Sequence, residues 1–382
     1  MEEQPLESIE TPALLLDQAK LDRNIGRMRA QLVQAGDGVV LRPHLKTAKS
    51  IEVARRVLGG TNGPITVSTL LEAERFAEAG ITDILYAVGI APAKLDRVIG
   101  IRRRGVDLTI ITDNLVAAEA IAAAARASGE PIPVLIEIDS DGHRGGVPSE
   151  DPERLTAIAR VLAAGGAVPR GVMTHYGGSY DARSQGELDE AARRERETTL
   201  AAADTLRAAG FEAPVVSIGS TPTALNAKDL AGLTEIRAGV YVFFDLVMAG
   251  LGVCSIDEIA LSVLATVIGH QRDKGWILVD AGWMAMSRDR GTANQTVDQG
   301  YGLVCDANGR PIPDLIMTGA NQEHGIIAVR PGSTASLPDL PVGTQLRILP
   351  NHACATAAQF GAYHVLGADG AVTARWARFN GW

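Results

Sequence analysis

The chain has 382 residues, of which 46% are apolar but only 4% aromatic, so its core must consist mainly of Ala, Val, Leu and Ile. A formal net charge of −9 argues against a nucleic-acid or anionic membrane partner. Cys254, Cys305 and Cys354 are odd in number and far apart, which favours a reducing compartment over a disulfide framework. The acidic N-terminus has no apolar signal core and no long apolar span follows, so we expect a cytoplasmic protein.

Eight short apolar or β-branched segments follow one another along the first two thirds of the chain, and helical periods separate most of them. We expect strands at 39–44, 64–69, 83–88, 107–113, 133–139, 170–175, 214–220 and 235–244. The clearest helices are expected at 70–80, 114–129, 151–166 and 187–210. This count predicts an α/β fold, a (β/α)8 barrel of TIM type. An open doubly wound sheet is the alternative, but no G-x-G-x-x-G follows the first strand.

The pattern changes after about residue 255. Short strand-like segments separated by Gly, Asp, Asn and Pro recur at 260–271, 275–287, 312–329, 343–352 and 371–382. These segments predict a second, mostly β C-terminal domain. We therefore expect three parts: an N-terminal strand in residues 1–15 that joins the β domain, the barrel in 16–255, and the β domain in 256–382.

In such a barrel the chemistry collects where strands end and loops to helices begin. This rule selects His44, Lys46 and the residues in 139–144, 175–180, 220–223 and 237–241. The segments "IGSTPTA" and "RAGVY" offer backbone N–H groups and hydroxyls that could hold a phosphate, with Lys46 across the mouth. Taken singly, Ser220 could be a helix cap, Arg237 an ion-pair partner and His175 a hydrogen-bonded core residue.

A second candidate site lies in the motif "NHAC" of the β domain, which contains His352 and Cys354. On an extended strand both side chains would point to one face, and imidazole with thiolate suits Zn²⁺ or a similar divalent ion. The spacing alone is weak evidence, because Cys is often simply buried.

Several ordered motifs are similar to one known family: "RPHLKTAKS", "EIDSDGHRGGV", "VMTHYGGSY", "VSIGSTPT", "EIRAGVYVFFD" and "ILPNHACAT". They resemble the D-threonine aldolase and D-serine dehydratase family, which are pyridoxal phosphate enzymes of fold-type III built like alanine racemase. The resemblance covers nearly the whole chain. The aldolases carry a second His in a pattern like R-P-H-x-K-x-H-K. This chain has Ala48 at that position, which favours the dehydratase branch.

The resemblance implies a role for each matching residue. Lys46 would form the Schiff base with pyridoxal 5'-phosphate and act as the catalytic base. Arg144 would approach the phenolic oxygen of the cofactor, and His175 and Tyr180 would complete the catalytic set, with Tyr180 near the substrate hydroxyl. Arg237 would lie at the pyridine nitrogen. The phosphate would bind to Gly219, Ser220, Thr221, Gly239 and Val240.

The remaining matches are less specific. His352 and Cys354 would hold a divalent metal such as Zn, Mn, Co or Mg, with Glu323 and His324 as its neighbours or as packing residues. We expect His44 to orient the site or pack on the cofactor ring. Lys49 would be solvated or bound to a backbone carbonyl.

The implied reaction is the elimination of water from a D-3-hydroxy amino acid, with D-threo-3-hydroxyaspartate preferred, giving oxaloacetate and ammonia. D-Serine dehydration and retro-aldol cleavage at the same site remain open. A racemase would need a second base, which the sequence does not identify. A non-catalytic pyridoxal phosphate carrier would lack the second domain and the H-x-C pair. By analogy with related folds we expect a homodimer, with a small-molecule substrate and no nucleic-acid or membrane partner.

Overall fold

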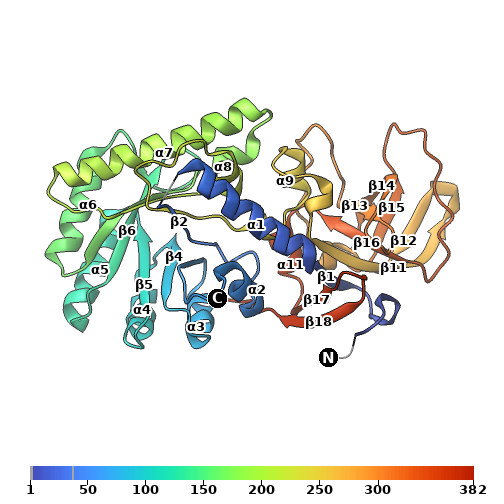
Figure 1. The fold of residues 1–382 in the computed structure, drawn as a ribbon, viewed down its shortest axis with the longest axis horizontal. Coiled ribbons are helices and arrows are strands. Elements are labelled where there is room, and N and C mark those ends of the chain that lie inside the picture. The colour runs from blue at the N-terminus through green and yellow to red at the C-terminus, as the bar shows by residue number, and fades with distance from the viewer. Residues whose placement is uncertain (1–2, 37) are drawn as a thin grey trace. The chain divides into compact units, whose positions relative to one another are not determined.

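The computed structural model describes residues 3–36 and 38–382 (Figure 1). The chain forms two compact units, one of Met1–Gly26 with Val240–Asn380 and one of Arg27–Gly239 with Gly381–Trp382. The ranges 1–15, 16–255 and 256–382 expected from the sequence stay a prediction. Among the residues that the structure describes, no helix combines the length and the apolar character needed to cross a membrane.

The unit of Arg27–Gly239 contains a parallel sheet whose strands lie in the order β2-β10-β9-β8-β6-β5-β4-β3, with the short β7 (Val147–Pro148) beside β6. The strands of this order are β2 (Val40–Leu41), β3 (Ile65–Val67), β4 (Asp83–Gly89), β5 (Asp107–Thr112), β6 (Pro133–Asp139), β8 (Val168–Thr174), β9 (Val215–Ile218) and β10 (Glu235–Ile236). All eight expected strands are confirmed. The last is much shorter than expected, because the chain turns at Gly239 into the 3-10 helix η4 (Val240–Val242).

The two outermost strands of this order, β2 and β3, are joined just beyond the end of β2. His44 forms a parallel bridge with Thr66. The N–H of Leu45 donates to the Thr66 carbonyl and the N–H of Thr66 donates to the Pro43 carbonyl, both at 2.9 Å. These bonds close the sheet into the expected barrel, and the closing segment leads directly into Lys46.

Helices alternate with these strands and surround the sheet (Figure 1). They are α2 (Ile51–Leu58), α3 (Leu70–Glu78), α4 (Leu95–Arg102), α5 (Leu115–Ser128), α6 (Pro152–Ala164), α7 (Gln185–Ala208) and α8 (Thr221–Asn226), with the 3-10 turns η2 (Pro92–Lys94) and η3 (Gly177–Asp181). The four clearest expected helices are confirmed as α3, α5, α6 and α7. Their starts follow ordinary capping: the side chain of Asn114 accepts from the N–H of Ala117, and that of Ser184 accepts from the N–H of Glu187.

One cluster of the barrel core comes from four neighbouring strands. Leu85, Ile111, Leu135 and Met173 belong to β4, β5, β6 and β8 and are each at most 2% exposed. Burying one such side chain stabilises the folded state by about 1.5–3 kcal/mol. The strand positions on which the candidate site depends are therefore held by a packed interior.

The other unit is built on a second sheet, with the strand order β12-β15-β14-β13-β16-β11-β1-β17-β18. An additional pairing of β12 with β11 closes part of it into a barrel. Its strands are β1 (Ala13–Asp17), β11 (Leu261–Gln271), β12 (Trp276–Val279), β13 (Gly302–Cys305), β14 (Pro311–Ala320), β15 (Gly325–Val329), β16 (Gln345–Pro350), β17 (Ala362–Leu366) and β18 (Val372–Ala377). The expected mostly β architecture is confirmed.

Short helices connect these strands. They are α9 (Leu246–Gly250), α10 (Trp283–Met286), α11 (Ala353–Ala357), η1 (Leu6–Ser8), η5 (Ile256–Glu258) and η6 (Arg272–Lys274), and the longer α1 (Gln18–Ala35) contains the boundary between the two units at Gly26. The strand β1 is an interior strand of the sheet, antiparallel to β11 and parallel to β17. Accordingly Leu14, Leu15 and Leu16 are fully buried.

Candidate functional site

The two lysines after β2 have different surroundings. Lys46 lies in the turn that follows the barrel-closing bridge, and its side chain is exposed. Lys49 adopts φ of 45°, and its Nζ lies 2.9 Å from Oε1 of Glu72, whose side chain is only 1% exposed. The expectation that Lys49 is solvated or bound to a carbonyl is therefore wrong, because the buried carboxylate at the start of α3 needs a charged partner. Lys46 is the lysine whose side chain reaches solvent.

Two histidines stand at strand ends of the barrel. Nδ1 of His175, just after β8, lies 2.9 Å from the carbonyl oxygen of Gly219. A carbonyl can only accept, so Nδ1 carries the proton and Nε2 of the neutral ring is an acceptor. The pKa of His175 is lowered to about 3, chiefly by burial and also by Arg144, Lys46 and Arg237, while the hydrogen bond with Gly219 opposes the shift. Burial, then Lys46 and Arg237, hold the pKa of His44 well below 6.5.

Arg237 follows β10 and is 3% exposed. Its guanidinium donates to the hydroxyl of Ser217 and to the carbonyl of Thr174. Burial lowers the pKa of Arg237, while Glu235 and two further carboxylates oppose this effect. The group is thus fixed in one orientation by hydrogen bonds from two neighbouring strands.

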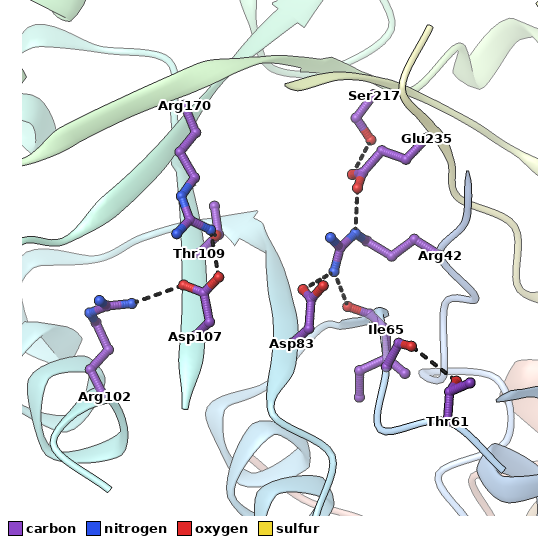
Figure 2. A network of polar contacts seen from close by, with 11 residues as sticks. Arg42, Thr61, Ile65, Asp83, Arg102, Asp107, Thr109, Arg170, Ser217 and Glu235 are labelled. Atoms are coloured by element: carbon purple, nitrogen blue, oxygen red, sulfur yellow. Dashed lines mark hydrogen bonds and ion pairs between the residues drawn. The ribbon is translucent and has the colours of Figure 1, made fainter. Parts of the chain in front are cut away.

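From Ser217 the polar contacts continue to Glu235, Arg42 and Asp83, as Figure 2 shows. The Ser217 hydroxyl donates to Glu235 at 2.6 Å, and Glu235 accepts from Nε of Arg42 at 2.7 Å. Arg42 also pairs with Asp83, at the start of β4. A separate group at the start of β5 joins Asp107 to Arg102 and Arg170. Charges at the N-terminal ends of barrel strands point to stability rather than catalysis.

The loops after β9 and β10 pack too tightly for side chains at two glycines. A Cβ on Gly219, where φ is 146°, would lie 1.9 Å from the carbonyl oxygen of Arg237. A Cβ on Gly239 would lie 2.8 Å from the carbonyl oxygen of His44. The expected helix-cap function of Ser220 is present, because its hydroxyl accepts from the N–H of Thr223 at 3.2 Å. Ser220 also lies within hydrogen-bonding distance of Ser179, at 3.1 Å.

Arg144 and Tyr180 lie on the loops after β6 and β8. The exposed Arg144 places Nη2 3.9 Å from Oε1 of Glu137, which belongs to β6. Burial raises the pKa of Glu137, and Arg144 opposes this effect. The ring of Tyr180, in η3, is 6.3 Å from the His175 ring between centroids. The structure therefore brings Arg144, His175, Tyr180 and Arg237 to the same end of the barrel.

Glu195 is a residue of this region that the sequence reading missed. It lies on α7 with 0% exposure, and its Oε1 accepts from the N–H of Tyr176 at 2.9 Å and of Gly219 at 3.2 Å. Burial raises its pKa. Its neighbours in the segment "RRERET" are mostly charged, which suggests an exposed position. Glu195 nevertheless lies on the buried face of α7, between Leu188 and Thr199. That position is the signal that could have identified it.

The candidate metal pair lies just after β16. His352 has an extended backbone and caps α11, so Cys354 is helical and the expected extended strand is wrong at this point. The helix begins here because the buried carboxylate of Asp245 accepts the N–H of Ala353 at 2.9 Å. The altered backbone does not separate the two side chains, because His352 and Cys354 are hydrogen-bonded.

The imidazole of His352 also contacts a carboxylate, that of Asp289. Nδ1 of His352 lies 2.6 Å from Oδ2 of Asp289. Burial alone would lower the pKa of His352, but the hydrogen bonds to Asp289 and Cys354 outweigh it and raise the pKa to about 11. Glu323 and His324, which the sequence suggested as neighbours, lie exposed between β14 and β15. Over residues 3–36 and 38–382, no three His, Cys, Asp or Glu side chains are arranged as a metal-binding group.

Two family models match the chain. The alanine racemase N-terminal domain model matches residues 16–247, and the model described as "Putative serine dehydratase domain" matches residues 260–366. Among curated proteins, a D-threo-3-hydroxyaspartate dehydratase from Delftia sp. (strain HT23) is 56% identical over 377 residues, covering 98% of both chains. A D-threonine aldolase from Arthrobacter sp. is 31% identical over 355 residues, covering 91% of this chain and 86% of the relative.

A solved structure is similar over the same length. It is a cysteine-to-alanine variant of D-threo-3-hydroxyaspartate dehydratase in the metal-free form. It superposes with a TM-score of 0.95 and 55% identity, and the match covers 99% of this chain and 100% of that chain.

Proposed function

Because this chain belongs to the D-serine dehydratase family of alanine racemase-like enzymes, we propose that it dehydrates a D-3-hydroxy amino acid, with D-threo-3-hydroxyaspartate as the preferred substrate. The observation that carries the substrate choice is the full-length similarity to the Delftia dehydratase, which has more than half of its residues in common with this chain. Ala48 adds support, since it is buried where the aldolase pattern has a second histidine.

Enzymes of this family use pyridoxal phosphate, and the barrel fits this cofactor. The tight approaches at Gly219 and Gly239 keep backbone amides accessible to a phosphate. Nδ1 of His44 is buried and has no hydrogen-bond partner among the described residues, as expected for a ring nitrogen that binds a cofactor. We assign Lys46 to the bond with the cofactor aldehyde. The phosphate contacts are assigned to Gly219, Ser220, Thr221, Gly239 and Val240.

Each candidate side chain of the barrel would then have its own role at the reacting carbon of the substrate. The bound cofactor supplies a conjugated ring that accepts electrons released at Cα. Once the substrate amine has replaced it at the aldehyde carbon, the free amine Nζ of Lys46 would take the Cα proton from one face. A base on one face predicts a single configuration at Cα, and the family relationship indicates D. Arg237 is fixed by its hydrogen bonds to Ser217 and Thr174 and would contact the ring nitrogen of the cofactor, and Arg144 would approach the phenolic oxygen. Tyr180 would lie near the substrate hydroxyl, and His175, kept neutral by burial, would complete the catalytic set.

The poor leaving group is the β-hydroxyl, and we propose that a divalent metal assists its departure. Imidazole Nε2 of His352 and the thiolate of Cys354 form a donor set that suits Zn²⁺, Mn²⁺ or Co²⁺ more than Mg²⁺. Such an ion supplies a Lewis acid when bound. The name of the solved relative, a cysteine-to-alanine variant in the metal-free form, supports this assignment.

The test is a product analysis. Protein supplied with pyridoxal phosphate and Zn²⁺ should convert D-threo-3-hydroxyaspartate to oxaloacetate and ammonia, measured by chromatography, and should lose this activity on chelation. Lys46→Ala should abolish both the absorbance of the bound cofactor and turnover. Lys228→Ala, at an exposed ion pair with Asp189, is the matched control and should change neither.

Other products would select the alternatives. Glycine with glyoxylate would make the chain an aldolase acting through the same lysine. Turnover of D-serine alone would move the preferred substrate within the dehydratases. Full activity in Lys46→Ala would contradict the assignment of the lysine itself.

A further inference from the structure

The hydrogen bond between His352 and Asp289 joins two segments that are 63 residues apart in the chain. We propose that Asp289 is a positioning residue that sets the affinity of His352 for its metal ion. This inference rests on the metal site of the proposed function, and it concerns a residue that does not itself bind the ion.

The orientation follows from the number of protons on the ring. A carboxylate accepts only, so Nδ1 of a neutral His352 carries the ring proton toward Oδ2 of Asp289, 2.6 Å away. The lone pair then stands on Nε2, the nitrogen that a metal can take. Without Asp289 the ring could rotate or exchange its tautomer, and both changes would reduce the fraction of molecules ready to bind.

Asp289 is itself held in place. Its Oδ1 accepts from the N–H of Gly291 at 2.8 Å, which leaves Oδ2 for the imidazole. The side-chain amide of Asn351, next to His352 in the chain, donates to the carbonyl of Asp289 at 3.2 Å and to that of Gly300 at 2.7 Å. Asn351 is 2% exposed. The loop that carries the carboxylate is thus fastened to the strand end that carries the histidine.

The negative charge acts in the same direction as the geometry. A carboxylate on the far nitrogen makes the imidazole a more basic ligand, and removing such a partner costs about 10–100-fold in metal affinity. Replacing Asp289 by Asn keeps an acceptor for Nδ1 but removes the charge, whereas replacing it by Ala removes both. Comparing the two variants therefore separates the effect of the His352 ring orientation on metal affinity from the effect of the ring's basicity.

The experiment measures Zn²⁺ affinity directly, by competition with a chromophoric chelator, on the full chain after metal removal. Asp289→Ala should bind Zn²⁺ about 10–100-fold more weakly than the unaltered protein, and Asp289→Asn should fall between them. Asp298→Asn is the matched control. This carboxylate lies on the same loop and pairs with Arg290 at 2.8 Å. Its Oδ1 accepts from the N–H of Gly300 at 2.9 Å, and Asn keeps this accepting oxygen, so the loop retains that bond. Its variant should bind Zn²⁺ within about threefold of the unaltered protein, well short of the loss expected for Asp289→Ala.

The outcomes distinguish the inference from its premise. If the unaltered protein binds no Zn²⁺, or Cys354→Ala binds it equally well, the metal site of the proposed function fails. If the unaltered protein binds Zn²⁺ and both Asp289 variants bind it equally well, the inference is overturned and the metal site stands. Equal losses in Asp289→Asn and Asp298→Asn would show only a disturbed loop and also overturn it. If Asp289→Ala does not fold, judged by circular dichroism, Asp289→Asn decides.

Discussion

At the scale of single residues, His175 shows how burial sets the state of a group. Nδ1 of its ring donates a hydrogen bond to the Gly219 carbonyl, and the low pKa of about 3 keeps the ring neutral at physiological pH. A histidine in this state is a hydrogen-bonding group rather than a charge. It also creates an acid-sensitive point in the fold, because the unfolded chain can accept a proton that the folded chain resists.

The low pKa of His175 predicts the direction in which stability changes with pH and the pH range of that change. The unfolded ring takes up a proton near pH 6.5 and the folded one only near pH 3, so His175 makes stability fall as the pH drops from about 6.5 toward 3. The loss is about 1.4 kcal/mol per pH unit within this window. Urea unfolding of cofactor-free protein at several pH values should give a shallower slope for His175→Gln than for the unaltered chain. Equal slopes would contradict the neutral buried state.

At the scale of elements, α7 does more than cover the barrel. Through Glu195 it accepts hydrogen bonds from the backbone after β8, at Tyr176, and after β9, at Gly219. One helix side chain thus links the loop that carries His175 and Tyr180 with the loop that we assign to the phosphate. An acceptor shared by a buried N–H group and a partly buried one is costly to remove, because both donors would lose their partner.

Glu195→Ala should therefore weaken pyridoxal phosphate binding. Loss of a buried acceptor costs about 1–3 kcal/mol, or roughly 5–150-fold in affinity. Glu195→Gln keeps the accepting oxygen and, since burial already favours the uncharged carboxyl, should stay within about threefold of the unaltered affinity. Glu197→Ala, an exposed neighbour on α7 paired with Arg193, is the control. Cofactor titration followed by absorbance checks the series, and equal binding by Glu195→Ala would refute it.

At the scale of the whole molecule, the barrel is held by charge as well as by apolar packing. Arg42 has a side chain only 13% exposed, and it pairs with Glu235 and Asp83 in the network of Figure 2. Burial would lower the pKa of Arg42, but Glu235 and Asp83 raise it, so the charge is maintained. Buried ion pairs are weak sources of stability when intact, but breaking one leaves an uncompensated charge.

Arg42→Ala should lower the free energy of unfolding of the barrel by about 3–5 kcal/mol, because Glu235 would lose its buried cation. Arg272→Ala removes one side of an exposed ion pair with Asp339 and should cost at most about 1 kcal/mol. Denaturant titrations monitored by circular dichroism compare the two. Similar small losses in both variants would show that the Arg42 pair contributes little.

The fold could be predicted from the sequence because its signals are local. Each barrel strand is a short apolar run between polar residues, and each long helix carries its own period and caps. The strand expected at 235–244 is shorter than expected for a local reason too. The residues after Gly239 are apolar or aromatic, but Gly239 turns the chain, and apolarity alone does not distinguish a strand from a buried turn.

The candidate site was predictable only in part, since it depends on contacts between distant segments. Strand ends selected Lys46, His175 and Arg237 without knowledge of any contact. The pairing of Lys49 with Glu72 and of His352 with Asp289 could not be read from spacing, because tertiary structure brings these groups together. The helical start at Ala353 depends in the same way on the distant carboxylate of Asp245.

The interior position of β1 has a consequence for how the protein is made. Residues 13–17 are synthesised before their partners in the sheet, which are β11, from residue 261, and β17, from residue 362. The strands of the parallel barrel, all within residues 40–236, are synthesised in between and depend mainly on sequence neighbours. Three consecutive leucines of β1 must therefore stay unpaired through most of translation, which makes this segment the expected binding site for a chaperone during synthesis.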